Sequence, residues 1–370
     1  MRLAPKHRLA RSRRSGNAFL WLLVILAAAG LLWILWSTGK KIKPHKAVSS
    51  SPPPAATSTV AVVPPNKPTH AKTNAPLLSP VAGFPRPVQT ILEAQLALDR
   101  QGISSGSLDG KIGSQTRAAI RAFQHESELP ETGELDDATK TNLTLDTPPI
   151  TTYTVTSNDL ARLQPVSKTW TGKSQQTALD YETILELVAE KSHSHPNLIR
   201  RLNPAVNWTN VSAGTSLQVP DVTADDPSTK AAFARISLSE KILEAFDSDS
   251  NLLVHFPCSI AQRVEKRPVG ELHVAVVAPN PNYTFDPELF PESSEARQQP
   301  GVKLIIPPGP NNPVGTVWIG LDKPGYGMHG TPRPEDVGRT ESHGCFRLAN
   351  WNAERLLKIV WVGMPVYVEP

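Results

Sequence analysis

Cysteine is scarce throughout this sequence, and acidic side chains are missing from its N-terminal part. Cys258 and Cys345 are the only two cysteines, which excludes a disulfide scaffold and any multi-cysteine zinc or iron–sulfur site. Residues 1–80 hold 12 of the 38 Lys/Arg and none of the 34 Asp/Glu. Residues 81–370 therefore carry 26 basic against 34 acidic side chains, a net charge of −8. A body of this charge is not expected to bind nucleic acid.

Length and proline content point to several domains joined by linkers. A chain of 370 residues exceeds what one hydrophobic core usually organises, so two or three domains are expected. The hydrophobic share of 39% and the charged share of 19% are typical of a globular protein. The 36 prolines are about twice the usual share, which indicates linker segments.

An uncharged apolar run of 19 residues, 18–36, follows a basic tail over residues 1–17. As a helix it would span roughly 28 Å, close to the hydrocarbon thickness of a bilayer. Six Lys/Arg precede the run and four follow it, which favours a cytoplasmic N-terminus. The sequence thus predicts a single-pass anchor in the cytoplasmic (inner) membrane, with the rest of the chain in the periplasm or another extracytoplasmic space. A cleaved signal peptide is the alternative, although its apolar core is normally shorter.

Residues 37–80 are rich in Pro, Ser, Thr, Ala and Lys. Such a segment cannot bury enough apolar surface to order itself. We expect a disordered linker that lets the following domains work away from the membrane.

Residues 84–145 predict a compact module of three short helices. Val88, Ile91, Leu92 and Leu96 have helical spacing, and Gly102 stands where that helix would end. Ser114 is expected to cap a second helix and Asp136 a third. The glycine-rich turns and helix positions resemble the peptidoglycan-binding type 1 domain in a set of matching residues: Asp109, Gly110, Gly113, Thr116, Ala119, Phe123, Gln124, Thr132, Gly133, Leu135 and Asp136.

Residues 151–222 predict a strand, two helices and a closing strand. The two helices lie around residues 184–189 and 198–202, and residues 214–220 form the last strand. The pattern, with its LNP and GTSLQVP segments, resembles a LysM module, a family that binds the glycan of peptidoglycan or chitin. Residues 157–180 are longer than the turn that this family has there. Glycan binding and a purely structural spacer therefore both remain open for this module.

Residues 230–369 predict a mostly β domain, a sandwich or barrel-like sheet, from short alternating strands broken by Gly and Pro. Near its end stand His329-Gly330-Thr331 and then Ser342-His343-Gly344-Cys345-Phe346-Arg347-Leu348. A free thiol is only a few per cent thiolate at neutral pH, so a neighbouring imidazole makes it a better nucleophile. If Cys345 opens a strand, Arg347 lies on its face, and Phe346 and Leu348 enter the core.

Taken singly, these residues have ordinary structural explanations. A lone cysteine is often an inert buried residue, and a lone histidine a structural one. A metal site lacks fixed third and fourth ligands. Together, the HGT and SHGC-x-RL segments resemble the L,D-transpeptidase catalytic domain. Arg267-Pro268-Val269-Gly270 stands where that family usually has a TP-x-G turn.

The resemblance implies a role for each residue of the two segments. Cys345 would be the nucleophile and His329 the general base, with His343 as the alternative base. His343 and Gly344 would shape the site and its oxyanion-binding amides. Arg347, Ser342, Gly330 and Thr331 would contact the substrate. A backbone carbonyl is expected to orient His329, with Asp336 or Glu341 as alternatives.

The resemblance also implies a reaction on peptidoglycan without a metal or organic cofactor. Cys345 would attack a tetrapeptide stem, release the terminal D-Ala and form a thioester, which the amine of another stem resolves into a 3→3 cross-link. Water as acceptor would make a carboxypeptidase, and a lipoprotein amine would attach that protein to the wall. A non-catalytic wall-anchoring protein is the alternative from another class. The partners are thus the stem peptides and glycan of peptidoglycan, and the membrane through residues 18–36.

Two further residues carry expectations of their own. Cys258 is expected to be a small buried hydrophobic residue, with a redox disulfide to Cys345 as the alternative. Asn352 is expected to cap a helix over residues 353–359.

Overall fold

The computed structural model describes residues 83–340 and 344–370, which belong to one compact unit. The predicted tail, membrane anchor and linker, residues 1–80, lie outside the described residues, and so do Glu341, Ser342 and His343. Within the described part of the chain, no helix combines the length and the apolar character that crossing a membrane requires.

The first module contains the three predicted helices, which are α2 (Ile91–Arg100), α3 (Ser114–Glu126) and α4 (Asp137–Asn142). The strands β1 (Arg86–Pro87) and β2 (Thr144–Leu145) pair antiparallel and join its two ends. Asp136 caps α4 as expected, since its side chain accepts from the Thr139 amide. The prediction for Ser114 was wrong: it is the first residue of α3, and the cap position is held by Gly113, which has no side chain to bond the free amides.

The middle module has the predicted strand–helix–helix–strand frame and two additional short helices. Strands β3 (Ile150–Thr154) and β4 (Ser216–Pro220) pair antiparallel. Helices α7 (Ile184–Lys191) and α8 (Pro196–Leu202) pack their apolar faces beneath them. The long segment between β3 and α7 forms α5 (Ser157–Ala161) and α6 (Trp170–Ser174).

The C-terminal domain is built on one mixed sheet of eight strands in the order β13-β12-β11-β8-β14-β5-β6-β7. Its strands are β5 (Phe233–Ser237), β6 (Ile242–Phe246), β7 (Leu252–Pro257), β8 (Gly270–Pro279), β11 (Val317–Leu321), β12 (Gly327–His329), β13 (Phe346–Arg347) and β14 (Pro365–Glu369). The pairs β12–β13 and β14–β5 are parallel, and the other pairs are antiparallel. Short 3₁₀ turns lie at Val264–Lys266 and Pro334–Asp336.

The sheet curls until its two edges meet. Ser259, just beyond edge strand β7, exchanges two backbone hydrogen bonds of 2.9 and 3.0 Å with Arg347 of the other edge strand, β13. The two edges are joined at this one bridge, so the sheet is barrel-like without closing along its whole length. Strand β6 was not predicted from the sequence.

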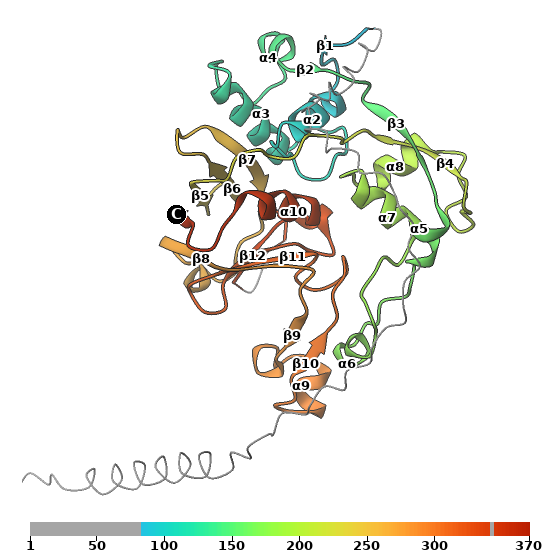
Figure 1. Ribbon diagram of the computed structural model, residues 1–370, viewed down its shortest axis with the longest axis vertical. Helices are drawn as coiled ribbons and strands as arrows, with labels where there is room; N and C mark the ends of the chain where they lie inside the picture. The colour runs from blue at the N-terminus through green and yellow to red at the C-terminus, as the bar shows by residue number, and fades with distance from the viewer. Residues whose placement is uncertain (1–82, 341–343) are drawn as a thin grey trace, which may run out of the picture. The chain divides into compact units, whose positions relative to one another are not determined.

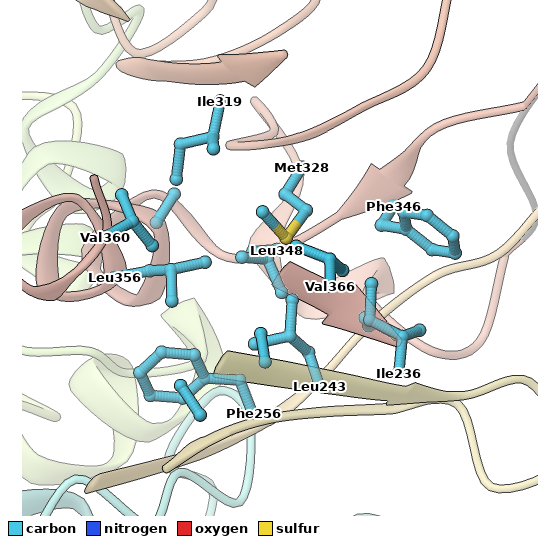
Figure 2. Close-up of a cluster of buried hydrophobic side chains, with 14 of the residues drawn as sticks. Ile236, Leu243, Phe256, Ile319, Met328, Phe346, Leu348, Leu356, Val360 and Val366 are labelled. Carbon is cyan, nitrogen blue, oxygen red and sulfur yellow. The ribbon is translucent and has the colours of Figure 1, made fainter. Parts of the chain in front are cut away.

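The core of this domain lies on the concave side of the sheet, beneath helix α10 (Asn350–Ile359) (Figures 1 and 2). Figure 2 shows Met328 of β12 and Phe346 of β13 among these core side chains. Asn352 does not cap the helix as predicted. The helix begins at Asn350, one turn earlier, and the buried Asn352 amide donates to Ser104 Oγ of the first module.

Between β8 and β11 the chain makes an excursion, residues 280–316, that packs against the middle module. It contains β9 (Tyr283–Phe285), a turn at Pro287–Leu289, α9 (Ser294–Gln298) and β10 (Leu304–Ile306). Trp170 of α6 stacks on Phe285 with ring centroids 4.4 Å apart. The buried Glu295 carboxylate accepts from the Trp170 amide at 2.8 Å. The unusually long segment of the middle module thus contacts the C-terminal domain, and Figure 1 shows α6 beside β10 and α9.

Candidate active site

The register of two parallel strands places the predicted base and the predicted arginine on one face. Met328 pairs with Phe346, and His329 pairs with Arg347. Met328 and Phe346 are 0% and 1% exposed and point into the core. Because side chains alternate along a strand, His329 and Arg347 lie on the opposite face. Cys345 comes directly before β13, and the Arg347 charge acts on the pKa of both His329 and Cys345, so the arginine lies near each of them. Phe346 and the fully buried Leu348 enter the core as predicted.

His329 is a buried imidazole with a fixed tautomer. It is 4% exposed, and its Nδ1 lies 2.6 Å from the carbonyl oxygen of Gly330. Because a carbonyl only accepts, Nδ1 carries the proton and Nε2 is left as the basic nitrogen. The Trp318 ring stacks on the imidazole at 5.6 Å. Burial lowers the pKa of His329 to about 4, and Arg347 lowers it further while the Gly330 carbonyl opposes the shift. The imidazole is thus neutral at pH 7 and able to accept a proton.

The turn after His329 is supported from behind by Asn350. Its Oδ1 accepts from the Thr316 amide at 3.2 Å and lies so close to Gly330 that any Cβ there would collide with it. Its Nδ2 donates to Glu190 Oε1 of α7 at 3.0 Å. Burial raises the pKa of Glu190 to about 8. The middle module therefore contributes a side chain to the support of the histidine turn, which the sequence did not indicate.

Cys345 lies half-buried directly before β13, and its Sγ donates to the Gly325 carbonyl at 3.5 Å. Burial raises the pKa of the thiol to about 11, against the opposing effects of a backbone bond from Gly327 and of Arg347. At neutral pH the site therefore holds a thiol and a neutral imidazole. A neutral thiol reacts when a base accepts its proton during attack, and the free Nε2 of His329 has the protonation state that such a base needs.

Tyr283 of the excursion belongs to the same electrostatic environment. Burial raises its pKa to about 12, Cys345 and Asp286 add to the shift, and Arg347 opposes it. Burial lowers the pKa of Arg347, which Cys345 and Tyr283 counteract. No local motif surrounds Tyr283, so only the fold identifies it as a neighbour of the site.

Of the remaining predicted site residues, the structure describes Gly330, Thr331 and Gly344. Gly330 and Thr331 follow His329 directly, and Thr331 is 7% exposed. Gly344 directly precedes Cys345. Among the described residues, a Cβ at Gly344 would come within 4 Å of the Tyr326 ring alone, at 3.8 Å. Ser342 and His343 lie outside the described residues.

The orientation of His329 follows the expectation drawn from the family. The Gly330 carbonyl holds the ring, whereas Asp336 forms an ion pair of 2.6 Å with Arg333. Glu341, the other alternative, lies outside the described residues.

Cys258 is fully buried in the core beside Phe346, and burial raises its pKa to about 12. Both cysteines are free. Since Cys345 faces away from that core, a disulfide between them has no geometry in this fold. Among the described residues, no group of three or more His, Cys, Asp and Glu is placed to hold a metal ion.

A curled sheet that presents a thiol, an oriented imidazole and a guanidinium on one face is the arrangement of a cysteine-dependent acyltransferase. The family model of the L,D-transpeptidase catalytic domain (YkuD) matches residues 231–368, and that of a putative peptidoglycan binding domain matches residues 88–143. The chain therefore carries the catalytic domain of the L,D-transpeptidases, and we identify it as an enzyme of that class.

Individual relatives cover different shares of the chain. The putative L,D-transpeptidase YkuD of Bacillus licheniformis is 26% identical over 186 residues, which are 50% of this chain and 93% of that protein. The putative L,D-transpeptidase YqjB of Bacillus subtilis is 36% identical over 106 residues, 27% of this chain and 51% of that protein. Among solved structures, L,D-transpeptidase 3 from Mycobacterium tuberculosis is 18% identical, covers 44% of this chain and 77% of that chain, and has a TM-score of 0.29.

Proposed function

We propose that this protein is a membrane-anchored L,D-transpeptidase that forms 3→3 cross-links in peptidoglycan through a thioester on Cys345. The observation that carries the proposal is the pairing of His329 with Arg347 across β12 and β13, with Cys345 directly before β13 and within reach of the Arg347 charge. The apolar run over residues 18–36 supports the anchor, with the catalytic domain on the extracytoplasmic side.

The chemistry proceeds in two transfers. The Cys345 sulfur attacks the carbonyl carbon of the third stem residue while His329 Nε2 takes the thiol proton. The imidazolium then gives that proton to the departing D-Ala amine, and a thioester remains. An amine of a second stem attacks the thioester, a new amide forms, and the thiol is restored. Arg347, whose guanidinium is held on the same face, is suited to a substrate carboxylate.

The peptidoglycan-binding domain supports the wall polymer as the substrate. For the middle module, whose frame follows the LysM order, glycan binding and structural support remain the two proposals. Its contacts with the excursion and with Asn350 favour structural support.

The test is incubation of the full-length chain, kept in detergent, with disaccharide-tetrapeptides, followed by mass spectrometry. We expect cross-linked dimers and free D-Ala from the unaltered chain and neither product from Cys345→Ala. Tripeptides without dimers would make the chain a carboxypeptidase, and transfer to a lipoprotein amine alone would make it an attachment enzyme. Unchanged substrate would support the non-catalytic wall anchor and contradict the proposal.

A further inference from the structure

A polar pocket of about 320 Å³ lies where the first module, α8 and the segment before Cys345 meet. Its walls come from the loop before α3, the first turn of α3, the start of α8 and Arg339. The predicted catalytic residues do not line this pocket, and the reaction proposed above does not use it.

The N-terminus of α3 opens into this pocket without a cap. The 13-residue helix follows Gly113, and its first turn holds no acidic residue. No side chain of the described residues caps its first amides. Gly113, Ser114, Gln115 and Thr116 all line the pocket. The first amides of a helix have no acceptor within the helix and carry partial positive charge, so they favour an anion.

A second observation at the same place also indicates a ligand. Ser105 is 4% exposed and lines the pocket, yet its Oγ has no hydrogen-bond partner among the described residues. The neighbouring Ser107 Oγ is likewise unpartnered within that part of the chain. Leaving a buried hydroxyl unsatisfied is costly, so native structures usually supply a partner. A ligand oxygen in the pocket would be that partner.

The charges around the pocket have the matching sign. Three cationic side chains line the pocket, those of Lys111, Arg201 and Arg339, against one carboxylate, that of Asp109. Asp109 Oδ1 already accepts from Gln95 Nε2 at 3.0 Å and from the Lys111 amide at 2.9 Å. Neither Lys111 nor Arg339 has an ion-pair partner within the described ranges. The pocket thus keeps an excess of positive charge next to the free helix amides.

We propose that this junction pocket binds an oxyanion of a cell-wall polymer, either a carboxylate of peptidoglycan or a phosphate of an anionic wall polymer. The choice of a wall polymer rests on the proposed function, whereas the anionic chemistry rests on the pocket itself. The first amides of α3, together with Ser105, Lys111 and Arg339, are the groups that would recognise the ligand.

The pocket is also connected to the strand of the nucleophile. Gln115, in its wall, donates from Nε2 to the Val337 carbonyl at 2.6 Å. The next amide, that of Gly338, donates to Ser259 Oγ at 2.9 Å, and Ser259 pairs with Arg347. A bound wall polymer would therefore be held beside the segment that leads to Cys345, which would favour productive placement of its stems.

The test is a binding titration of the full-length Cys345→Ala chain in detergent with three probes. The first is an N-acetylglucosamine–N-acetylmuramic acid disaccharide, which has a free carboxylate and no peptide to occupy the active site. The second is an oligomer of glycerol phosphate, and the third is neutral chitobiose. We expect one or both anionic probes to bind, with affinity that falls as salt rises, and chitobiose not to bind. The anionic probe that binds identifies the source of the oxyanion.

Variants at one backbone position then locate the binding. Gly113 has an extended backbone and open space around its Cα, so either substitution fits. Gly113→Asp places a carboxylate on the α3 amides and should weaken the anionic probe at least tenfold while raising the melting temperature. Gly113→Ala adds no cap, and its affinity should stay within twofold. The double variant Lys111→Gln/Arg339→Gln should also lose at least tenfold.

Binding of chitobiose as tight as that of the anions, absence of binding by either anion, or full affinity in Gly113→Asp would each overturn the proposal. A chain that binds the anions and makes no cross-link with Cys345 intact would instead refute the proposed function and leave this site in place.

Discussion

At the scale of the residue, the site is defined by two groups whose pKa values are shifted so that both are neutral at pH 7. Burial lowers the pKa of His329 to about 4 and raises that of Cys345 to about 11. Between these values the imidazole is a free base and the sulfur keeps its proton. A thiol that keeps its proton is oxidised less readily than a thiolate.

This predicts an unusual pH dependence of acylation. The rate constant for acylation of Cys345 by a carbapenem, followed by mass spectrometry, should be nearly constant from about pH 5 to pH 10. It should fall to half near pH 4, because protonation of His329 removes the base. His329→Ala should be slow at neutral pH and gain rate only as the thiol ionises towards pH 11. A midpoint near the ordinary histidine pKa of 6.5, with the protein folded by circular dichroism, would contradict the neutral pair.

At the scale of the element, the excursion of residues 280–316 depends on α6 for its position. Trp170 packs on Phe285, Phe290 and Tyr283, and Glu295 fixes the start of α6. Gly309 fits only because it lacks a Cβ, which would collide with the Leu179 carbonyl of the middle module. Tyr283, on the same excursion, is the group that approaches Cys345 and Arg347.

Trp170→Ala should therefore weaken substrate binding in addition to lowering the stability of the fold. Loss of a half-buried aromatic contact should cost about 2 kcal/mol of unfolding free energy. KM for disaccharide-tetrapeptide should rise several-fold with a smaller change in kcat, and amide hydrogen exchange should speed up over 283–306. Trp170→Phe should restore most of both properties.

The matched control is Trp208→Ala. Trp208 belongs to the same module but packs against the module's own hydrophobic core. It should lower stability and leave KM unchanged. Equal effects on KM from both variants would show that Trp170 does not position the excursion.

At the scale of the whole molecule, the three modules share polar contacts that tie the active site to the rest of the chain. Asn352 reaches Ser104 of the first module, and Asn350 reaches Glu190 of the middle module. The Glu190 carboxyl group that accepts this bond is buried, and burial raises its pKa from 4.5 to about 8.

Glu190 should make the folded protein less stable as pH rises. Its folded pKa lies above its unfolded pKa, so the folded state binds more protons between pH 4.5 and 8 and loses stability through that window. His329 acts in the opposite sense, because its lowered pKa costs stability as pH falls from 6.5 to 4. Glu190 should thus make the largest contribution between pH 6.5 and 8, at up to about 2 kcal/mol.

Urea unfolding at each pH measures this dependence, and Glu190→Gln should abolish the decline between pH 6.5 and 8. A decline that persists in Glu190→Gln would assign it to another group.

The sequence by itself determined what depends on local spacing. The period of two along β13 fixed which side chains share the face of Cys345, the spacing of apolar residues fixed α2, α7 and α8, and the HGT and SHGC segments identified the catalytic class. The bounds of α10, strand β6 and the cap of α3 were missed, because a cap or a short strand is decided by partners that lie elsewhere in the chain.

The tertiary structure alone decided which chain-distant surfaces meet. Packing between modules brought Tyr283, Glu190 and Asn350 to the active site. It also brought Ser105, Gly113 and Arg339, up to about 230 residues apart in sequence, to one pocket. A local pattern specifies the face on which a side chain lies, because backbone geometry repeats over two to four residues. What that face meets depends on how whole modules bury their apolar surfaces against each other, and no short stretch of sequence contains that information.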